Sequence, residues 1–317
     1  MTSPSGLHRL GETDPGIRNR TEARARSGPD FLCIGLQKAG TYWLYDQLEQ
    51  HPEFWMPPLK ELRYFNGFAT NTADFKFLLE HGGRPVRAQN DDPQAEKCFR
   101  PLDERDRAFL ERATALLSRE TDCDAYSRLF DFKDGLLSGD LSPQYSAIDA
   151  SLIEKIIAKF PELRVVLLVR DPIERFWSAL SMKMRNRPTV APKSADDWDD
   201  VLRFASDRGV RALSFPSKIA ARWRRFVAPE RFAFYFFDDI CGQPVATRRS
   251  ILSFLGADPE KPSGGLSPGF DRKRGQRKQP VSDAIRERLI EHFADELRAC
   301  ARTFGGPALD WPARYGL

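Results

Sequence analysis

One short stretch, residues 31–41, constrains the fold more than any other part of the 317-residue chain. It begins with the apolar run Phe-Leu-Cys-Ile at 31–34, which is typical of a buried strand in a parallel sheet. A loop with a glycine at each end, residues 35–40, follows, and Thr41 begins a helical pattern. Such a strand, glycine loop and helix start predict an anion-binding turn, because backbone N–H groups and the helix dipole favour negative charge there.

The loop has the spacing of a nucleotide-binding P-loop but not its chemistry. Gly35 and Gly40 stand as far apart as the two P-loop glycines, yet Thr41-Tyr42 follows where Lys-[Ser/Thr] is expected. The lysine is Lys38, inside the loop, and the hydroxyl that would hold Mg²⁺ is missing. The pattern therefore favours a phosphate-type donor neutralised by protein cations over a metal-dependent NTPase. An ordinary glycine-containing turn is the alternative.

A second motif lies further along the chain. Residues 164–169 form an apolar, β-branched run that predicts a strand, and Arg170 closes it at the end where open α/β sheets bind ligands. An arginine there can hold a phosphate with two hydrogen bonds, and Ser178 on the following helix can add a third. A surface ion pair of Arg170 with Asp171 is the alternative.

Together the two motifs resemble those of the sulfotransferase family, whose donor is 3′-phosphoadenosine-5′-phosphosulfate (PAPS). The first is similar to the family's 5′-phosphosulfate loop and the second to its 3′-phosphate motif, and the resemblance extends from residue 31 to the C-terminus. It implies that Lys38 acts in catalysis as well as binding. The donor-binding residues that it implies are Lys38, Ala39, Gly40, Thr41, Tyr42, Arg170 and Ser178.

Residues 60–65, Lys-Glu-Leu-Arg-Tyr-Phe, resemble the Lys-Glu-x-His-[Phe/Tyr]-Phe segment of carbohydrate-type sulfotransferases. The glutamate of that segment is the general base, and it corresponds to Glu61. The family's histidine is replaced by Arg63. The resemblance implies that Lys60 and Arg63 contact the acceptor, whereas an exposed ion pair of Lys60 with Glu61 is the alternative.

Residues 136–145 predict a third strand and its following loop. They resemble the family's Glu-Lys-[Ser/Thr]-Pro-x-Tyr segment, with Asp140 in place of the glutamate and Leu141 in place of the lysine. Loss of that lysine argues against a standard glycan acceptor. Asp140 is assigned to the acceptor site, with a structural carboxylate as the alternative.

Residues 271–280 are the densest basic run of the chain. In the family a basic, glycine-containing loop at this point folds over the nucleotide. The matching residues are Arg274, Gly275, Gln276 and Arg277. A solvated loop or a nonspecific polyanion patch is the alternative.

Alternation of strand and helix patterns from residue 31 to 256 predicts one α/β domain, a P-loop-like three-layer fold with a central parallel sheet flanked by helices. Residues 30–317 form this domain and residues 1–29 a disordered tail. The charged, proline-containing segment 182–200 predicts a mobile loop over the site.

Composition excludes several functions. The net charge is only +4, which gives no reason to expect a nucleic-acid or membrane partner. The N-terminus has no apolar signal region, and the five scattered cysteines predict reduced thiols in a cytoplasmic protein. No Cys/His grouping has zinc spacing, so no metal is expected. The sequence leaves the oligomeric state open, a homodimer included.

The predicted function is transfer of the sulfuryl group from PAPS to a hydroxyl or amine of a small-molecule or carbohydrate acceptor, by in-line displacement with Glu61 as base and 3′-phosphoadenosine-5′-phosphate (PAP) as product. Two alternatives stay open. One is a nucleotide-dependent kinase, and the other is a non-catalytic protein that binds PAPS or polyanions.

Overall fold

The computed structural model describes residues 27–66, 78, 101–116, 121–186, 189, 192–262, 264–272 and 278–317. At the start of the described chain, the Ser27 hydroxyl lies 2.9 Å from the Ser127 hydroxyl. Lys133 then donates to the carbonyl of Gly28 at 3.0 Å and to the carboxylate of Asp30.

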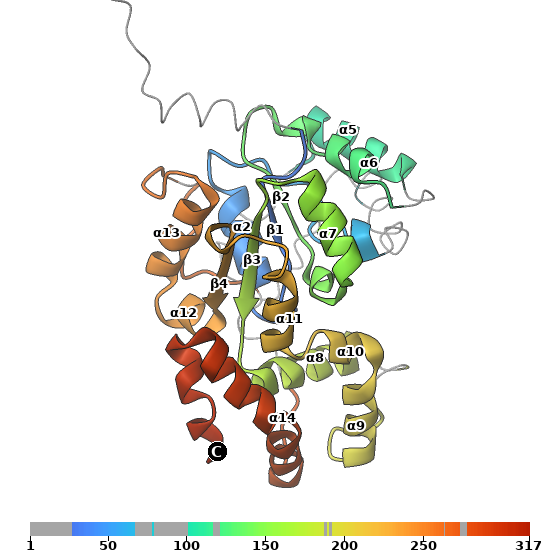
Figure 1. Ribbon diagram of the computed structural model, residues 1–317, viewed down its shortest axis with the longest axis vertical. Helices are drawn as coiled ribbons and strands as arrows, with labels where there is room; N and C mark the ends of the chain where they lie inside the picture. Colours follow the sequence, from blue (N-terminus) through green and yellow to red (C-terminus); the bar gives the residue numbers. More distant parts are fainter. Residues whose placement is uncertain are drawn as a thin grey trace, which may run out of the picture.

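A parallel sheet forms the centre of the fold (Figure 1). Within the described ranges it has four strands in the order β2–β1–β3–β4. Their bounds are β1 Phe31–Cys33, β2 Gly139–Leu141, β3 Arg164–Val169 and β4 Phe232–Phe236. The predicted α/β fold with a parallel sheet is confirmed, and β3 has the bounds that the sequence predicts.

Strand order places a ligand crevice at one edge of the sheet. The chain leaves β1 for β2 on one side and then returns to β3 on the other side of β1. The connections after β1 and after β3 therefore run in opposite directions from adjacent strand ends. In open α/β sheets, ligands bind at this point, outside the carboxyl ends of the strands.

Helices cover both faces of the sheet, which completes the three layers. In Figure 1, α2, α12 and α13 lie on one side of the strands, and α7 and α11 on the other. This is the arrangement that right-handed crossovers produce for this strand order. The bounds are α2 Thr41–Glu49, α7 Ala150–Lys159, α11 Pro216–Trp223, α12 Phe237–Gly242 and α13 Pro244–Leu255.

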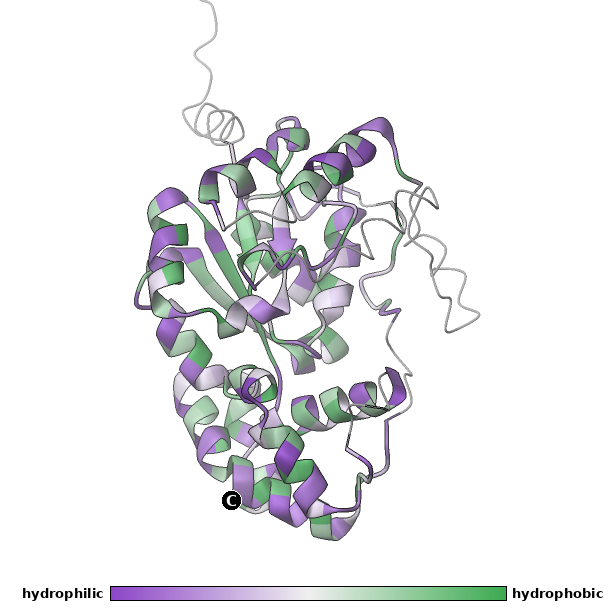
Figure 2. Cartoon of the chain, turned by 90° about the vertical axis from the view of Figure 1, so that its right-hand side faces the viewer, coloured by the Kyte–Doolittle hydropathy of each residue, from purple (hydrophilic) through white to green (hydrophobic). Residues whose placement is uncertain are grey.

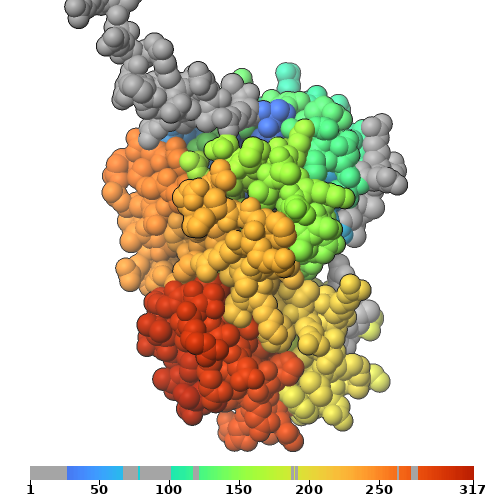
Figure 3. Space-filling model, in the orientation of Figure 1, coloured from blue at the N-terminus to red at the C-terminus, as the bar shows by residue number. Residues whose placement is uncertain are grey.

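A further group of helices lies beyond the carboxyl ends of the strands, in the lower half of Figures 1 and 3. These are α8 Pro172–Asn186, α9 Trp198–Ser206, α10 Arg208–Ala212 and α14 Asp283–Phe304. At the opposite end lie α5 Glu104–Ala115 and α6 Cys123–Arg128. Short 3₁₀ helices are η1 Tyr64–Asn66, η3 Asp131–Lys133, η4 Pro143–Ala147, η6 Pro229–Arg231, η7 Gly306–Asp310 and η8 Ala313–Tyr315.

The hydrophobic core follows the sheet and the inner sides of these helices (Figure 2). The strands β1 and β3 are buried almost throughout, as expected for strands covered on both faces. Trp311 is fully buried, with its ring centroid 5.8 Å from that of Phe236 on β4. The C-terminal segment is therefore anchored in the core.

One local prediction differs from the structure. Instead of a loop from residue 182, α8 continues to Asn186, and α9 begins at Trp198. Beside β2, Phe54 makes a single bridge with Leu137. Pro57 and Pro58 come soon after it in the chain, and since proline has no N–H group, they cannot extend the ladder.

Candidate active site

The glycine loop turns sharply between β1 and α2. Gly40, the residue before α2, has φ 94°, and a Cβ atom there would lie 2.9 Å from Cδ1 of Ile240. Only glycine combines this left-handed backbone with such close packing. Gly40 has no side chain to accept from the first N–H groups of α2, so a bound anion can accept from them instead.

A cavity of about 890 Å³ opens at the carboxyl ends of β1 and β3, where strand order predicts a ligand site. It is walled by the glycine loop, by one face of α8, by the α9–α10 turn, by residues 61–66 and by η4. The predicted donor-binding residues that line it are Lys38, Gly40, Thr41, Tyr42, Arg170 and Ser178. Two distant motifs therefore meet in one cavity.

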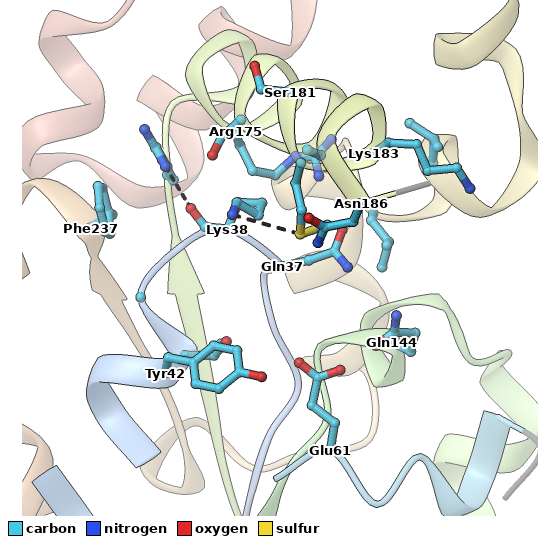
Figure 4. Close-up of a pocket in the computed structure, with 18 of the residues that line it drawn as sticks. Gln37, Lys38, Tyr42, Glu61, Gln144, Arg175, Ser181, Lys183, Asn186 and Phe237 are labelled. Carbon is cyan, nitrogen blue, oxygen red and sulfur yellow. Dashed lines mark hydrogen bonds between the residues drawn. The ribbon is translucent and has the colours of Figure 1, made fainter. Parts of the chain in front are cut away.

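Lys38 and Arg170 connect the two motifs directly. Arg170 Nη1 donates to the carbonyl of Lys38 at 2.8 Å, and the Lys38 ammonium lies 3.9 Å from Met182 Sδ on α8 (Figure 4). The Arg170 guanidinium also lies over the Phe237 ring, 4.3 Å from its centroid. Burial lowers the pKa of Arg170, and the Glu174 carboxylate opposes this. Arginine stays protonated in proteins, so the site carries this positive charge.

The sequence Asp171-Pro172 explains why α8 begins directly after Arg170. The Asp171 carboxylate accepts from the backbone N–H groups of Ile173 at 2.9 Å and Glu174 at 3.2 Å. Pro172 is the first residue of the helix, where its missing N–H is no loss. The helix consequently places the side chain of Ser178, two turns along, in the cavity wall.

Glu61 is the only carboxylate among the predicted site residues that lines the cavity. One oxygen accepts from Lys60 Nζ at 2.7 Å, and the other accepts from Arg63 Nε at 3.1 Å. Burial alone would raise the pKa of Glu61, but Lys60 and Arg63 outweigh it and hold the pKa below its ordinary value of 4.5. Glu61 is therefore ionised at neutral pH, and in Figure 4 it points into the cavity that Lys38 borders from another wall.

The other residues assigned to the acceptor lie in different places. Arg63 lines the cavity, whereas Lys60 lies behind Glu61, buried against the Tyr42 ring at 4.3 Å from its centroid. Among the residues assigned to the donor, Ala39 is buried in the loop and does not line the cavity.

Asp140 is the clearest departure from the sequence prediction. It is fully buried in β2 and does not line the cavity. Hydroxyl groups surround it, because Ser142 donates to one oxygen at 2.6 Å and Tyr145 donates to the other at 2.5 Å. Burial raises the pKa of Asp140, against the effect of these donors. The burial of this carboxylate away from the cavity favours its structural alternative over contact with the acceptor.

The basic loop can be followed only at its two ends, because Arg274, Gly275, Gln276 and Arg277 lie outside the described residues. Before them, Arg272 pairs with the buried Asp46 carboxylate at 2.6 Å. After them, Trp177 Nε1 donates to the carbonyl of Gln279 at 2.7 Å, and Lys278 lines the cavity. Both ends of the loop are thus fixed beside the cavity, on α2 and α8.

Arg175 is a cavity residue that the sequence reading missed. Its guanidinium is fully buried, donates to Ser214 Oγ at 2.7 Å and has no hydrogen-bond partner at Nε (Figure 4). Burial, together with the charge of Arg170, lowers the pKa of Arg175 to about 9. The signal was available: positions 175, 178 and 182 are three and four residues apart, which places them on one face of a helix.

Neither a metal centre nor a membrane anchor is visible in the described part of the chain. No group of three or more His, Cys, Asp or Glu side chains there could hold a metal ion. No helix in the same ranges is both long and apolar enough to span a bilayer.

The arrangement agrees with a comparison of the sequence with known families. The sequence pattern described as the sulfotransferase family matches residues 29–261. The chain belongs to the sulfotransferase family. A sulfotransferase enzyme is therefore the confirmed part of the sequence prediction, and the matched region contains β1–β4 and the cavity walls formed by the glycine loop and α8.

A solved sulfotransferase shares the fold, and a second one shows a weaker likeness. The crystal structure of a sulfotransferase from Alicyclobacillus acidocaldarius is 21% identical, with a TM-score of 0.60 over 89% of this chain and 98% of that one. Sulfotransferase STF9 from Mycobacterium avium is 17% identical, with a TM-score of 0.48 over 89% of this chain and 79% of that one. A comparison with curated proteins finds no match.

Proposed function

We propose that this sulfotransferase moves the sulfuryl group from PAPS to a hydroxyl or amine of a small-molecule or carbohydrate acceptor, with Glu61 as general base. One observation carries the proposal: Lys38, Arg170 and Glu61 line the same cavity, at the carboxyl ends of β1 and β3. Two cations and one ionised carboxylate are the charges that an anionic donor and a protonated acceptor need.

The donor side of the cavity fits a molecule with several phosphate-type groups. Lys38, Arg170 and Arg175 supply three positive charges, and the open start of α2 supplies backbone donors. At the end of the basic loop, Lys278 adds another cation to the cavity wall. This excess of cations supports PAPS, whose 5′-phosphosulfate and 3′-phosphate are both anionic.

The acceptor side combines charged and uncharged polar groups. Besides Glu61 and Arg63, the cavity wall includes the amide side chains of Gln37, Gln144 and Asn186. Amides donate and accept hydrogen bonds, so they suit an acceptor with several hydroxyl groups.

A cytoplasmic location stays a prediction from the sequence.

The proposed reaction is a single displacement. The acceptor oxygen or nitrogen forms a bond to sulfur while the bond from sulfur to the 5′-phosphate oxygen breaks. The acceptor proton passes to the Glu61 carboxylate, and the Lys38 ammonium neutralises the charge that develops on the departing phosphate oxygen. Most of the acceleration comes from placement and charge stabilisation, by analogy with phosphoryl transfer.

Calorimetric titration with PAP, beside ATP with Mg²⁺, tests the donor. We expect micromolar binding of PAP, weakened about tenfold to a hundredfold by Arg170→Ala because a charge-assisted hydrogen-bond pair is lost. Arg231→Ala is the matched control, since Arg231 pairs only with the exposed Glu162 and does not line the cavity.

Three outcomes separate the alternatives. Binding of ATP with Mg²⁺ and none of PAP would refute the proposal and favour a kinase. Binding of PAP without PAP release from PAPS, unchanged by Glu61→Gln, would favour a non-catalytic binder. PAP binding with Glu61-dependent release supports the transferase.

A further inference from the structure

The segment that carries Glu61 has an unusual backbone. Glu61 has φ 68° and Arg63 has φ 54°, so two non-glycine residues take the left-handed conformation with only Leu62 between them. Side chains other than glycine avoid this region unless the surroundings enforce it. The conformation turns Leu62 into the core and Glu61 toward the cavity.

Hydrogen bonds from the β2–η4 segment account for this conformation. The backbone N–H of Leu62 donates to the Asp140 carboxylate. The next N–H, that of Arg63, donates to Ser142 Oγ at 2.9 Å, and the Ser142 hydroxyl in turn donates to Asp140 Oδ1 at 2.6 Å. Asp140 therefore holds two successive peptide groups, one directly and one through Ser142.

Two tyrosines complete the environment of the carboxylate. Tyr145 donates to Asp140 Oδ2 at 2.5 Å and accepts from the backbone N–H of Phe65. Tyr126 donates to the same oxygen at 3.1 Å, and its ring centroid lies 4.5 Å from that of Phe65. Within the described residues, the donors to Asp140 come from this cluster or from the Glu61 segment.

We propose that Asp140 is a positioning residue for sulfuryl transfer, which acts by fixing the backbone at Leu62 and Arg63 so that the Glu61 carboxylate faces the reacting groups. The inference rests on the proposed function of Glu61 as base. Asp140 touches neither donor nor acceptor, because it does not line the cavity. Its substitution should therefore lower kcat and leave donor affinity unchanged.

The first test measures the backbone directly, by hydrogen–deuterium exchange of the Leu62 and Arg63 amides. We expect strong protection in the wild-type protein and its loss in Asp140→Asn, because asparagine keeps only one acceptor oxygen for the four donors that share the two carboxylate oxygens. Glu296→Gln is the matched control. Glu296 is also a buried carboxylate that accepts from a backbone N–H and a hydroxyl, both of Ser217, but it lies on α14 away from the cavity.

The second test is a double-substitution cycle on PAP release from PAPS. We expect Asp140→Asn to lower kcat about tenfold to a hundredfold, with an unchanged Kd for PAP, since small misplacements of a reacting group have effects of this size. In the Glu61→Gln background the same substitution should have no further effect on kcat. Ser142→Ala should show the same pattern with a smaller loss, and it carries the test if Asp140→Asn does not fold.

The outcomes are distinguishable from failure of the proposed function. Unchanged amide protection at Leu62 and Arg63 in both variants would overturn the inference whatever the reaction is. Equal losses of kcat with and without Glu61 would overturn it too, since Asp140 would then act on stability alone. Absence of PAP binding by the wild-type protein would refute the donor instead.

Discussion

The pH dependence of the reaction should be set by Lys60, a residue that never enters the cavity. Lys60→Met removes the ammonium that donates to Glu61 at 2.7 Å and keeps a side chain of similar length. Both partners are shielded from solvent, with side-chain exposures of 3% for Lys60 and 15% for Glu61. Solvent therefore screens this pair only weakly, and loss of the Lys60 ammonium should raise the pKa of Glu61.

The size of the effect follows from Coulomb's law. Opposite charges about 4 Å apart interact with about 4 kcal/mol at an effective dielectric constant of about 20. Each pKa unit corresponds to about 1.4 kcal/mol, which sets an upper limit of about three units. Opposite charges in proteins shift carboxylate pKa values by about one to three units. The pKa of Glu61 now lies below 4.5, so the variant should gain about one to three units.

The assay is the pH profile of kcat for PAP release from PAPS. Protonation of Glu61 removes the base, so the wild-type rate should fall only below pH 4.5, and the acidic limb of Lys60→Met should lie about one to three pH units higher. At pH 8 the variant should keep its turnover, since Glu61 is again ionised. Lys261→Met is the control, because Lys261 pairs with Glu53, away from the cavity. An acidic limb that stays in place, or moves equally in the control, would show that Lys60 does not control the pKa of Glu61.

Two further predictions concern the donor side. Lys38→Ala should lower kcat about a hundredfold or more, by loss of charge stabilisation at the departing phosphate, and near-normal turnover would contradict that role. The exposed Cys241 lines the cavity, close enough to Arg170 to influence the pKa of that arginine. Bound PAP should therefore protect the Cys241 thiol from iodoacetamide. Peptide mapping by mass spectrometry measures this, with the partly buried Cys123 as the reference whose labelling PAP should not change. Equal labelling of Cys241 with and without PAP would contradict the placement of the donor.

The sheet and the glycine loop could be predicted because their signals are local. The strand β3 is a continuous apolar run whose length is visible in the sequence. Gly35 and Gly40 have φ values of 138° and 94°, which glycine adopts without strain, so their spacing reports the shape of the turn directly. Arg170 followed by Asp171-Pro172 also reports both a strand end and a helix start. Each of these features is fixed by residues within a few positions of one another.

The rest of the site depends on contacts between distant segments. Asp140 lies in a strand of only three residues, too short for alternation to show which face it occupies. Its partner Leu62, and Arg63, which Ser142 links to it, come from a segment almost eighty residues earlier. A polar residue beside an active-site motif is thus easily assigned to the substrate when its actual partners are backbone N–H groups. Arg175 was missed although it lies on the same helix face as Ser178, a residue that the sequence assigned to the donor.

Conformational strain at Glu61 and Arg63 explains how Asp140 can determine the position of the base. A left-handed non-glycine residue is destabilised by about 1–3 kcal/mol, and a single hydrogen bond contributes only about 1 kcal/mol. One bond cannot hold both residues, but the donors at Leu62, Arg63 and Phe65 are all accepted by one buried cluster. Removing the Asp140 carboxylate takes away acceptors and leaves the strain, so the segment should relax away from the cavity. Glu61 would then no longer face the reacting groups, although its charge and its neighbouring cations are unchanged.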